Sequence, residues 1–171
     1  MSTKMMKTLK FAAMTAIALF AAAALPANRN IYPNAGQANS DVAQALKAAA
    51  AAHKRVILDF GGNWCGDCVV LDSYFHDAKN LPLLEANFVL VHINIGNDGI
   101  DQNEDIAEKY GIPLKKGVPA LAVLSDKGKL LYSQRNGEFE KMRRMESTSV
   151  TEFLVQWRAP KAGCSAVAVN C

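Results

Sequence analysis

A short apolar run that ends in glycines and is followed at once by two cysteines constrains the fold of this chain more than any other feature. Residues 56–60 read Val-Ile-Leu-Asp-Phe and are apolar on both faces apart from Asp59, as in a central strand. Residues 61–63, Gly-Gly-Asn, interrupt the run. From Cys65 onward the spacing becomes helical, with further positions at Cys68, Leu71, Asp72 and Phe75. The pattern predicts a strand, a tight turn and a helix that begins at the first cysteine.

The rest of the chain supplies further strands and helices. Ser40 or Asp41 is expected to cap a first helix, and Ser149 with Glu152 forms a capping box for the last one. Between them the pattern predicts helices over residues 81–86 and 103–110, strands over residues 88–95, 120–124 and 130–134, and a hairpin turn at residues 126–129. A parallel βαβ unit followed by an antiparallel hairpin gives an α/β fold, in which helices flank both faces of a central mixed sheet of four to five strands.

The first 27 residues have the layout of a secretory signal. Lysines precede an apolar run over residues 11–25, and small residues offer cleavage after Ala24 or Ala27. The apolar run falls short of the ~20 residues that a membrane-spanning helix needs. We therefore expect residues 1–27 to be a cleaved signal peptide and the protein to be periplasmic; an uncleaved anchor is the alternative.

The remainder of the chain divides into three parts and is formally neutral. Residues 28–39, rich in Asn, Gly and Pro, predict a flexible leader, residues 40–159 a folded domain, and residues 160–171 a C-terminal tail. The net charge of +3 comes from the lysines of the first segment, so basic and acidic residues balance elsewhere. That balance predicts no binding to nucleic acid or to an anionic membrane.

The four cysteines form two local pairs, Cys65/Cys68 and Cys164/Cys171. Disulfide exchange needs a thiolate that attacks and a second thiol close enough to resolve the mixed disulfide. Cys65, at the helix start, faces unpaired amides and the positive end of the helix dipole, which favour its thiolate. Cys68 lies one turn further in, so we expect Cys65 to be the nucleophile and Cys68 the resolving thiol. A structural disulfide or half of a zinc site is the alternative, although the other pair has the wrong spacing for zinc.

The sequence around the first pair resembles the thioredoxin family. Residues 64–68, Trp-Cys-Gly-Asp-Cys, resemble its active-site motif, and Asp59, six residues before the first cysteine, matches its buried aspartate. Residues 109–112 and 117–119 resemble the family's helix end and cis-proline loop, and residues 126–129 match its turn before the last strand. The resemblance covers nearly the whole predicted domain and implies the thioredoxin fold and a thiol–disulfide oxidoreductase.

The resemblance also implies roles for residues beside the cysteine pair. Asp59, poorly solvated in a central strand, is expected to move the proton of Cys68; an acid at a strand edge that reaches water is the alternative. Pro119 is expected to follow a cis peptide bond that faces the cysteines, where an ordinary trans proline is the alternative. The Val118 amide is expected to pair with the substrate backbone. The other expected substrate-binding residues are Trp64, Gly66 and Asp67.

Several positions depart from the family pattern. Asp67 stands where thioredoxin has proline, and its charge opposes thiolate formation, which favours a reducing over a strongly oxidising centre. Residues 114–116 lengthen the loop beside the expected substrate groove, and residues 138–147 form a charged insert before the last helix. His92 lies mid-strand, where the motif tends to have a lysine near the buried acid. It either tunes Asp59 or is an ordinary strand histidine.

The second cysteine pair, Cys164 and Cys171, is expected to form a structural disulfide in the C-terminal tail. Such a link constrains the unfolded chain by roughly 2–3 kcal/mol. The alternative is a second redox pair that exchanges electrons with Cys65.

Together these features predict an exported, periplasmic protein-disulfide oxidoreductase that reduces its substrates through Cys65 and Cys68. We expect no bound cofactor and no metal, because the cysteines themselves are the redox centre. The expected partners are protein disulfide substrates and a redox partner that regenerates the pair, such as a membrane electron donor, and we expect a monomer. The alternative function is an exported copper-handling module in which both cysteines are soft thiolate ligands.

Overall fold

The domain combines strands and helices in the computed structural model, which describes residues 30–159. The elements are η1 (Ala35–Gln37), α1 (Ala38–Ala52), β1 (Arg55–Gly61), α2 (Gly66–Phe75), α3 (Leu81–Asn87), β2 (Phe88–Asn94), α4 (Glu104–Lys109), η2 (Leu114–Lys116), β3 (Ala120–Leu124), β4 (Leu130–Ser133), η3 (Met142–Arg144) and α5 (Ser147–Trp157). The expected signal peptide and the Cys164/Cys171 pair lie outside the described residues. Among the described residues, no helix has both the length and the apolar character to cross a bilayer.

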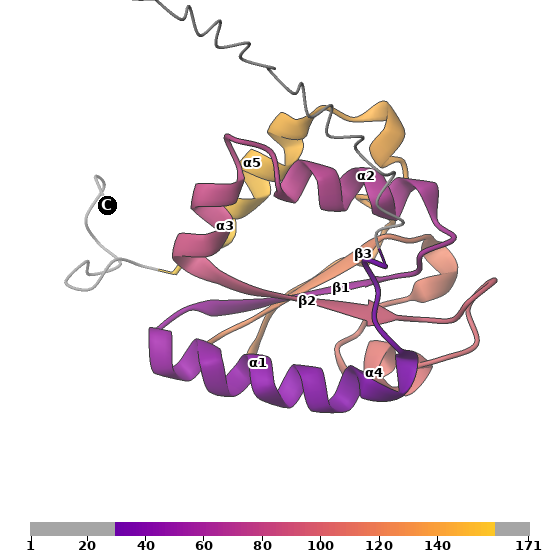
Figure 1. Ribbon diagram of the computed structural model, residues 1–171, viewed down its shortest axis with the longest axis horizontal. Helices are drawn as coiled ribbons and strands as arrows, with labels where there is room; N and C mark the ends of the chain where they lie inside the picture. Colours follow the sequence, from indigo (N-terminus) through magenta and orange to yellow (C-terminus); the bar gives the residue numbers. More distant parts are fainter. Residues whose placement is uncertain (1–29, 160–171) are drawn as a thin grey trace, which may run out of the picture.

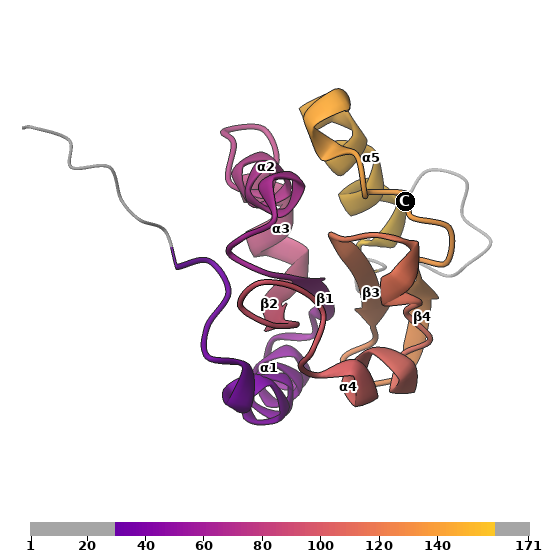
Figure 2. The ribbon, with the colours of Figure 1, turned by 90° about the vertical axis from the view of Figure 1, so that its right-hand side faces the viewer.

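One mixed sheet with the strand order β2-β1-β3-β4 forms the centre of the domain. The edge strand β2 runs parallel to β1, whereas β3 is antiparallel to both of its neighbours, β1 and β4. Figure 2 shows the four strands in this order. The prediction of an α/β fold with a central mixed sheet of four to five strands is therefore confirmed.

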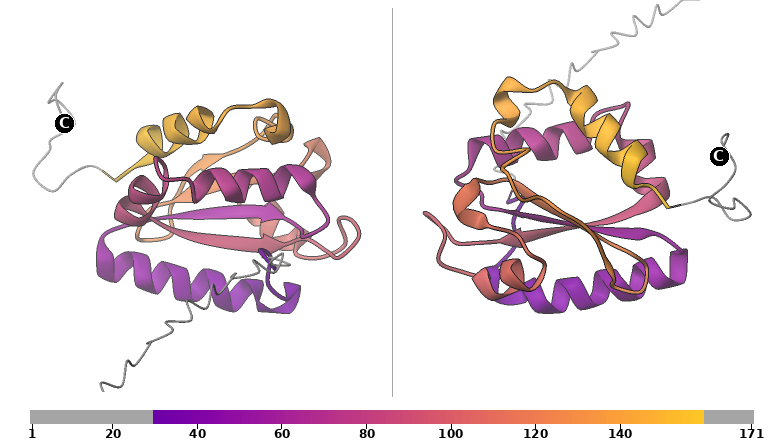
Figure 3. Two further views of the ribbon diagram at one scale, coloured as in Figure 1. Left: turned by 45° about the horizontal axis from the view of Figure 1, so that its top comes forward. Right: turned by 180° about the vertical axis from the view of Figure 1, so that it is seen from behind.

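Side chains of the strands alternate between two cores, one on each face of the sheet. Leu58 and Phe60 of β1 belong to a core with residues of α1 and α4, whereas Ile57 belongs to a core with residues of α2, α3 and α5. Figure 1 shows the same division, with α1 and α4 on one face of the sheet and α2, α3 and α5 on the other, and Figure 3 shows it from behind. Because strand side chains alternate with a period of two, Asp59 points to the α2 face.

The starts of the first and last helices differ from the sequence-based expectation. Helix α1 begins at Ala38 and not after Ser40, whose hydroxyl donates to the Gln37 carbonyl. Helix α5 begins at Ser147, so the predicted capping box of Ser149 and Glu152 is wrong. The Ser147 hydroxyl donates to Asp77, and the Ser147 carbonyl accepts a hydrogen bond from the Asn80 side chain. Contacts with the loop before α3 therefore fix the start of α5, and local sequence does not carry that information.

The segment before α1 also differs from the expectation of a flexible leader over residues 28–39. Tyr32 is fully buried, and its backbone is held at both ends by one side chain. Its amide donates to Asn63 Oδ1, and its carbonyl accepts from Asn63 Nδ2, at 3.0 and 2.8 Å. The same Asn63 amide donates to Asn30 Oδ1. Asn63 belongs to the turn between β1 and α2, so these hydrogen bonds hold the start of the domain against the cysteine motif.

Candidate active site

The cysteine pair lies at the junction of β1 and α2. Cys65 is the N-cap of α2, with extended backbone angles, and its Sγ accepts a hydrogen bond from the Cys68 amide at 3.1 Å. The two residues form a disulfide with their Cα atoms 5.2 Å apart. Cys65 retains 7% exposure, whereas Cys68 is completely buried. The structure therefore separates one sulfur that a partner can approach from another that it cannot.

The loop that leads into β3, the strand next to β1, faces the outer sulfur. The Val118–Pro119 peptide bond is cis, and the Val118 carbonyl oxygen lies 3.7 Å from Cys65 Sγ. Buried Gln134 braces this loop, because its amide donates to the Pro119 carbonyl and accepts from the Leu121 amide. Sequence reasoning missed Gln134, because a glutamine at the end of a predicted strand belongs to no recognisable motif.

Trp64 and Gly66 flank Cys65 and remain open to solvent. Trp64 is 41% exposed, and its indole nitrogen donates to the Gly96 carbonyl at 2.9 Å, which fixes the ring beside the cysteine. Gly66 is exposed at the first position of α2. The expected substrate-binding residues Trp64, Gly66, Val118 and Pro119 thus gather around one sulfur.

Asp67 is paired, contrary to the expectation that its charge acts freely on the cysteines. Its carboxylate accepts hydrogen bonds from the Arg143 amide at 2.8 Å and from Arg143 Nε at 3.1 Å, and Arg143 Nη2 lies 2.9 Å away. Burial alone raises the pKa of Asp67, but the bonds and charge of Arg143 outweigh it and lower that pKa. The insert that carries η3 therefore packs on the start of α2, and its Arg143 offsets the negative charge of Asp67 beside Cys65.

Asp59, in the strand that leads to the cysteine motif, is completely buried. Its Oδ2 accepts a hydrogen bond from the Tyr32 hydroxyl at 2.7 Å and lies 2.9 Å from His92 Nδ1. Its other oxygen, Oδ1, has no hydrogen-bond partner among the described residues. The register of the sheet explains the histidine contact, because Asp59 of β1 pairs directly with His92 of parallel β2. The contact favours the interpretation that His92 tunes Asp59 over that of an ordinary strand histidine.

His92 extends the cluster toward α2. Its Nε2 lies 3.5 Å from Asp72 Oδ1, and the same oxygen lies 3.2 Å from Nδ1 of His76, a residue at the surface. Burial lowers the pKa of His92, but the hydrogen bond and charge of Asp59, together with the charge of Asp72, outweigh it and raise that pKa. Sequence reasoning did not single out Asp72, although its place in the inward-facing spacing of α2 was a usable signal.

Tyr32 joins this cluster to the buried cysteine. Tyr32, Cys65 and Cys68 pack together as one buried group. A Cβ atom built on Gly61 would lie 2.5 Å from the Tyr32 hydroxyl and 2.8 Å from Cys68 Sγ, so both atoms pack against this glycine. Burial and the neighbouring charge of Asp59 raise the pKa of the Tyr32 phenol well above its ordinary value. The phenol therefore stays protonated and donates to Asp59.

Replacing Gly61 with alanine is expected to destabilise the protein, because the added methyl group would overlap Tyr32 and Cys68. Overpacking of this kind costs about 1–3 kcal/mol, which urea unfolding of the oxidised protein would measure. Gly99→Ala is the matched control, since a Cβ there meets no atom within 4 Å. Equal midpoints for the two variants would contradict the close contact at Gly61.

The raised pKa of His92 predicts a pH-dependent contribution to stability. Because the folded state binds the His92 proton more tightly than the unfolded chain, the contribution is complete below about pH 6.5 and is lost as the pH rises through the folded-state pKa. The gap in unfolding free energy between wild type and His92→Gln should therefore shrink with rising pH. Exposed His53 gives the control variant His53→Asn. A gap that is constant with pH would contradict the prediction.

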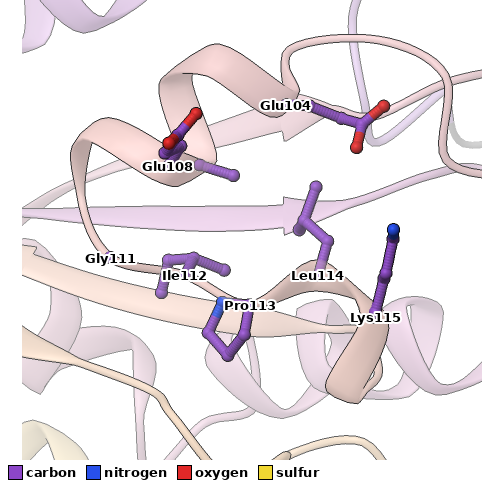
Figure 4. A pocket seen from close by; sticks show the side chains of 8 residues that line it. Glu104, Glu108, Gly111, Ile112, Pro113, Leu114 and Lys115 are labelled. Atoms are coloured by element: carbon purple, nitrogen blue, oxygen red, sulfur yellow. The ribbon is translucent and has the colours of Figure 1, made fainter.

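A separate hollow lies between α4 and η2. Figure 4 shows Glu104 and Glu108 on the helix and Ile112, Pro113 and Leu114 on the facing segment. No residue of the cysteine motif lines it. The loop extension over residues 114–116 is folded as η2, with Leu114 buried. Within residues 30–159, no group of three or more His, Cys, Asp or Glu side chains is arranged to hold a metal ion.

Comparisons with known proteins agree with this geometry. A family model described as thioredoxin-like matches residues 37–125. The crystal structure of a disulphide isomerase from Xylella fastidiosa Temecula1 superposes with a TM-score of 0.68 at 34% sequence identity, covering 73% of this chain and 94% of that one. A thioredoxin H-type from Fagopyrum esculentum is 27% identical over 74 residues, 43% of this chain. The chain spans about half the length (53%) of this curated relative.

Proposed function

Because this chain belongs to the thioredoxin-like family, we propose that it is an exported thiol–disulfide oxidoreductase that reduces or isomerises disulfides in other proteins. The observation that carries the proposal is the asymmetry of the cysteine pair. Cys65 is partly exposed at the start of α2 beside the cis-proline loop, whereas Cys68 is buried one turn behind it. This is the arrangement that a nucleophile and a resolving thiol require.

In the proposed reaction, the Cys65 thiolate attacks one sulfur of a substrate disulfide. The substrate S–S bond breaks, one substrate sulfur leaves as a thiolate and takes a proton, and the other is held in a mixed disulfide with Cys65. The thiol of Cys68 then loses its proton, and its sulfur attacks Cys65. The Cys65–Cys68 disulfide forms, and the second substrate sulfur leaves and is protonated, so that two electrons and two protons pass to the substrate.

The start of α2 supports the first step. The amide of Cys68 points at Cys65 Sγ, and the positive end of the helix dipole lies at the same place, so both stabilise negative charge on that sulfur. The pairing of Asp67 with Arg143 offsets the negative charge of Asp67, which would otherwise disfavour the Cys65 thiolate. Asp59, which like Cys68 is completely buried, is the proposed acceptor of the Cys68 proton in the second step.

Residues Trp64, Gly66, Asp67, Val118 and Pro119 are proposed to bind the substrate around the reacting sulfur. An extended segment that runs along the cis-proline loop can pair with the Val118 backbone as an added strand. A substrate held there brings its disulfide close to Cys65, because the Val118 carbonyl and Cys65 Sγ are 3.7 Å apart.

The working direction and the location are further parts of the proposal. A reductase or isomerase acts from the dithiol form, so a redox partner must return Cys65 and Cys68 to that form after each reduction. The secretory layout of residues 1–27 supports export to the periplasm. There, a membrane electron donor is the proposed source of reducing equivalents.

Two measurements test this function. The reduced protein should precipitate insulin by cleaving its interchain disulfides, and its midpoint against a glutathione series should lie below that of the glutathione couple. A midpoint far above that of glutathione would contradict the reducing direction and indicate an oxidase. Failure of the reduced protein to react with any protein disulfide would contradict the function itself.

A further inference from the structure

We propose that the charged insert over residues 138–147 selects protein substrates that carry an acidic residue next to the reacting cysteine, and that Arg143 and Arg144 bind this acid. The inference rests on the proposed function, because it names a class of substrate that reaches Cys65. It also goes beyond that function, since disulfide exchange itself requires no charge on the substrate.

The insert is anchored in the core of the domain. Phe139 and Met142 are buried in the core on the α2 face of the sheet. The Phe139 ring packs edge-on against Phe153 of α5, with 5.3 Å between the ring centroids. Met142 belongs to η3, and the two arginines that follow it in η3 are both exposed. A buried base therefore presents Arg143 and Arg144 to solvent.

The insert contacts both segments that flank Cys65. On one side, the backbone amide and the guanidinium of Arg143 bind Asp67 at the start of α2. On the other side, Glu140 lies so close to Gly117 of the cis-proline loop that a Cβ atom on this glycine would overlap its side chain. That loop faces the Cys65 sulfur. A substrate chain that runs along the cis-proline loop therefore passes beside the insert.

The Arg143 guanidinium lies flat against Gly66, the residue after Cys65. A Cβ atom on Gly66 would be 3.6 Å from Nη1 and 3.7 Å from both Cζ and Nε, and such similar distances mean that the plane of the group faces the glycine. Nε and Nη2 are directed at Asp67, whereas Nη1 has no hydrogen-bond partner within residues 30–159. The Nη1 donors are therefore open to a substrate carboxylate, while Asp67 holds the guanidinium in place.

The charges near the reactive sulfur also favour an acidic partner. Both acids of this surface are already paired, Asp67 with Arg143 and Glu140 with Lys141, whose Nζ lies 2.9 Å from Glu140 Oε1. Arg144 has no ion-pair partner among the described residues, so three cations against two acids leave one net positive charge. The two lysines of η2, just before the cis-proline loop, are exposed and add to this excess. A nearby substrate acid is attracted, and a nearby substrate base is repelled.

Three short peptides test the proposal. Each carries one cysteine as a mixed disulfide with 2-thiopyridine, and they differ only in the two residues beside the cysteine, which are both Glu, both Gln or both Lys. The Cys65 thiolate of the reduced protein attacks the peptide sulfur, the S–S bond breaks, and thiopyridine leaves and takes up a proton. Its absorbance reports the rate, and the leaving group is the same for every peptide.

The proposal predicts that the Glu peptide reacts about 3- to 10-fold faster than the Gln peptide, which is the effect of one or two exposed ion pairs. The Lys peptide should react more slowly than the Gln peptide. The ratio between the Glu and Gln rates should fall toward one as salt is raised from about 0.01 M to 1 M, because the screening length shrinks from about 30 Å to about 3 Å.

Two variants locate the selectivity in the insert. Arg144→Gln leaves the pair of Asp67 and Arg143 intact and should lower the ratio between the Glu and Gln rates. Arg143→Gln should lower it at least as much, because it also leaves the charge of Asp67 unpaired. The ratio is measured within one protein, so any general change in the reactivity of Cys65 cancels. Lys127→Gln is the control, since it removes one exposed positive charge from the turn at the other end of β3 and should keep the wild-type ratio.

The outcomes distinguish failure of this inference from failure of the proposed function. Equal rates for the Glu and Gln peptides with wild type would overturn the inference. A preference for Glu that survives in both arginine variants, or that Lys127→Gln also abolishes, would overturn it too, because the acid would then be recognised elsewhere or by overall charge alone. In each of these cases, a normal rate with the Gln peptide leaves the exchange activity intact. Failure of the reduced wild type to release thiopyridine from any peptide would instead reject the proposed function.

Discussion

Replacing Cys65 with serine is expected to abolish disulfide exchange, whereas replacing Cys68 with serine preserves the first attack and traps the product. Cys65 is the partly exposed sulfur of the pair, and Cys68 is enclosed by Tyr32 and the body of α2. A serine at position 65 leaves only a buried thiol, so insulin reduction should fall by several orders of magnitude, to the rate of a protein-free control. A serine at position 68 leaves the attacking thiolate but removes the group that resolves the mixed disulfide.

Mass spectrometry checks both halves of this prediction. The reduced Cys68→Ser protein, mixed with a disulfide-containing substrate, should accumulate as a stable covalent adduct of one protein and one substrate chain. The Cys65→Ser protein should form none. An adduct that forms on Cys68 in the absence of Cys65 would contradict the assignment of the two sulfurs, and the double variant gives the background.

Replacing Asp59 with asparagine is expected to slow resolution by Cys68 by about 10²- to 10⁴-fold, the range for loss of a positioned acid–base group. Asparagine has nearly the same shape and can still accept the Tyr32 hydrogen bond, but it cannot take up a proton at neutral pH. In a single-turnover reaction of the reduced protein with dithionitrobenzoate, one thionitrobenzoate is released when Cys65 attacks and a second when Cys68 resolves the mixed disulfide. The rate of the first release should be unchanged, because the Cys65 thiolate is stabilised by the start of α2 and not by Asp59.

The decisive comparison for Asp59→Asn is the ratio between the rates of the first and second thionitrobenzoate release in the same sample. A second release that keeps the wild-type rate would show that the buried carboxyl takes no part in proton removal. The exposed acid Asp98 gives a matched Asp→Asn control in the loop after β2. If both releases slow equally in Asp59→Asn, the substitution has disturbed the fold around the cysteines, and urea unfolding would detect the loss of stability.

The central part of the fold could be predicted from sequence because its signals are local. The apolar run of β1, the glycines after it and the helical spacing from Cys65 each fix a few neighbouring residues, and the structure confirms the strand and the helix within a residue or two. The hairpin of β3 and β4 likewise follows from a short turn between apolar runs. Such patterns reflect backbone preferences and alternation, which the chain expresses without tertiary contacts.

The N-terminal contribution to the site could not be predicted, because it depends on contacts between distant residues. Residues 30–34, Asn-Ile-Tyr-Pro-Asn, lie in a stretch rich in Asn, Gly and Pro, so on composition alone they predict a leader. They are held by Asn63, 31 positions after Tyr32, and by the hydrogen bond from Tyr32 to Asp59. Two adjacent apolar side chains, Ile31 and Tyr32, are the trace of this packing in the sequence, and that signal is weak.

The effect of Asp67 on Cys65 is another case in which a partner distant in sequence changes the sequence-based prediction. Its charge beside Cys65 predicts weaker thiolate formation, but Arg143, 76 positions later, pairs with it. The sequence does contain the charged insert over residues 138–147, yet nothing in it specifies which acid the arginine meets. Asp72 is different, since an acid at an inward-facing position of a helix is itself a signal that a buried partner exists.

The most direct test of this account is the rate at which iodoacetamide alkylates Cys65 in the reduced Cys68→Ser protein as the pH is lowered. The account predicts that Cys65 stays reactive at mildly acidic pH, well below the value of about 8.5 at which a free cysteine is half ionised, because the start of α2 stabilises its thiolate. Alkylation that follows the same pH dependence as free cysteine would contradict the account.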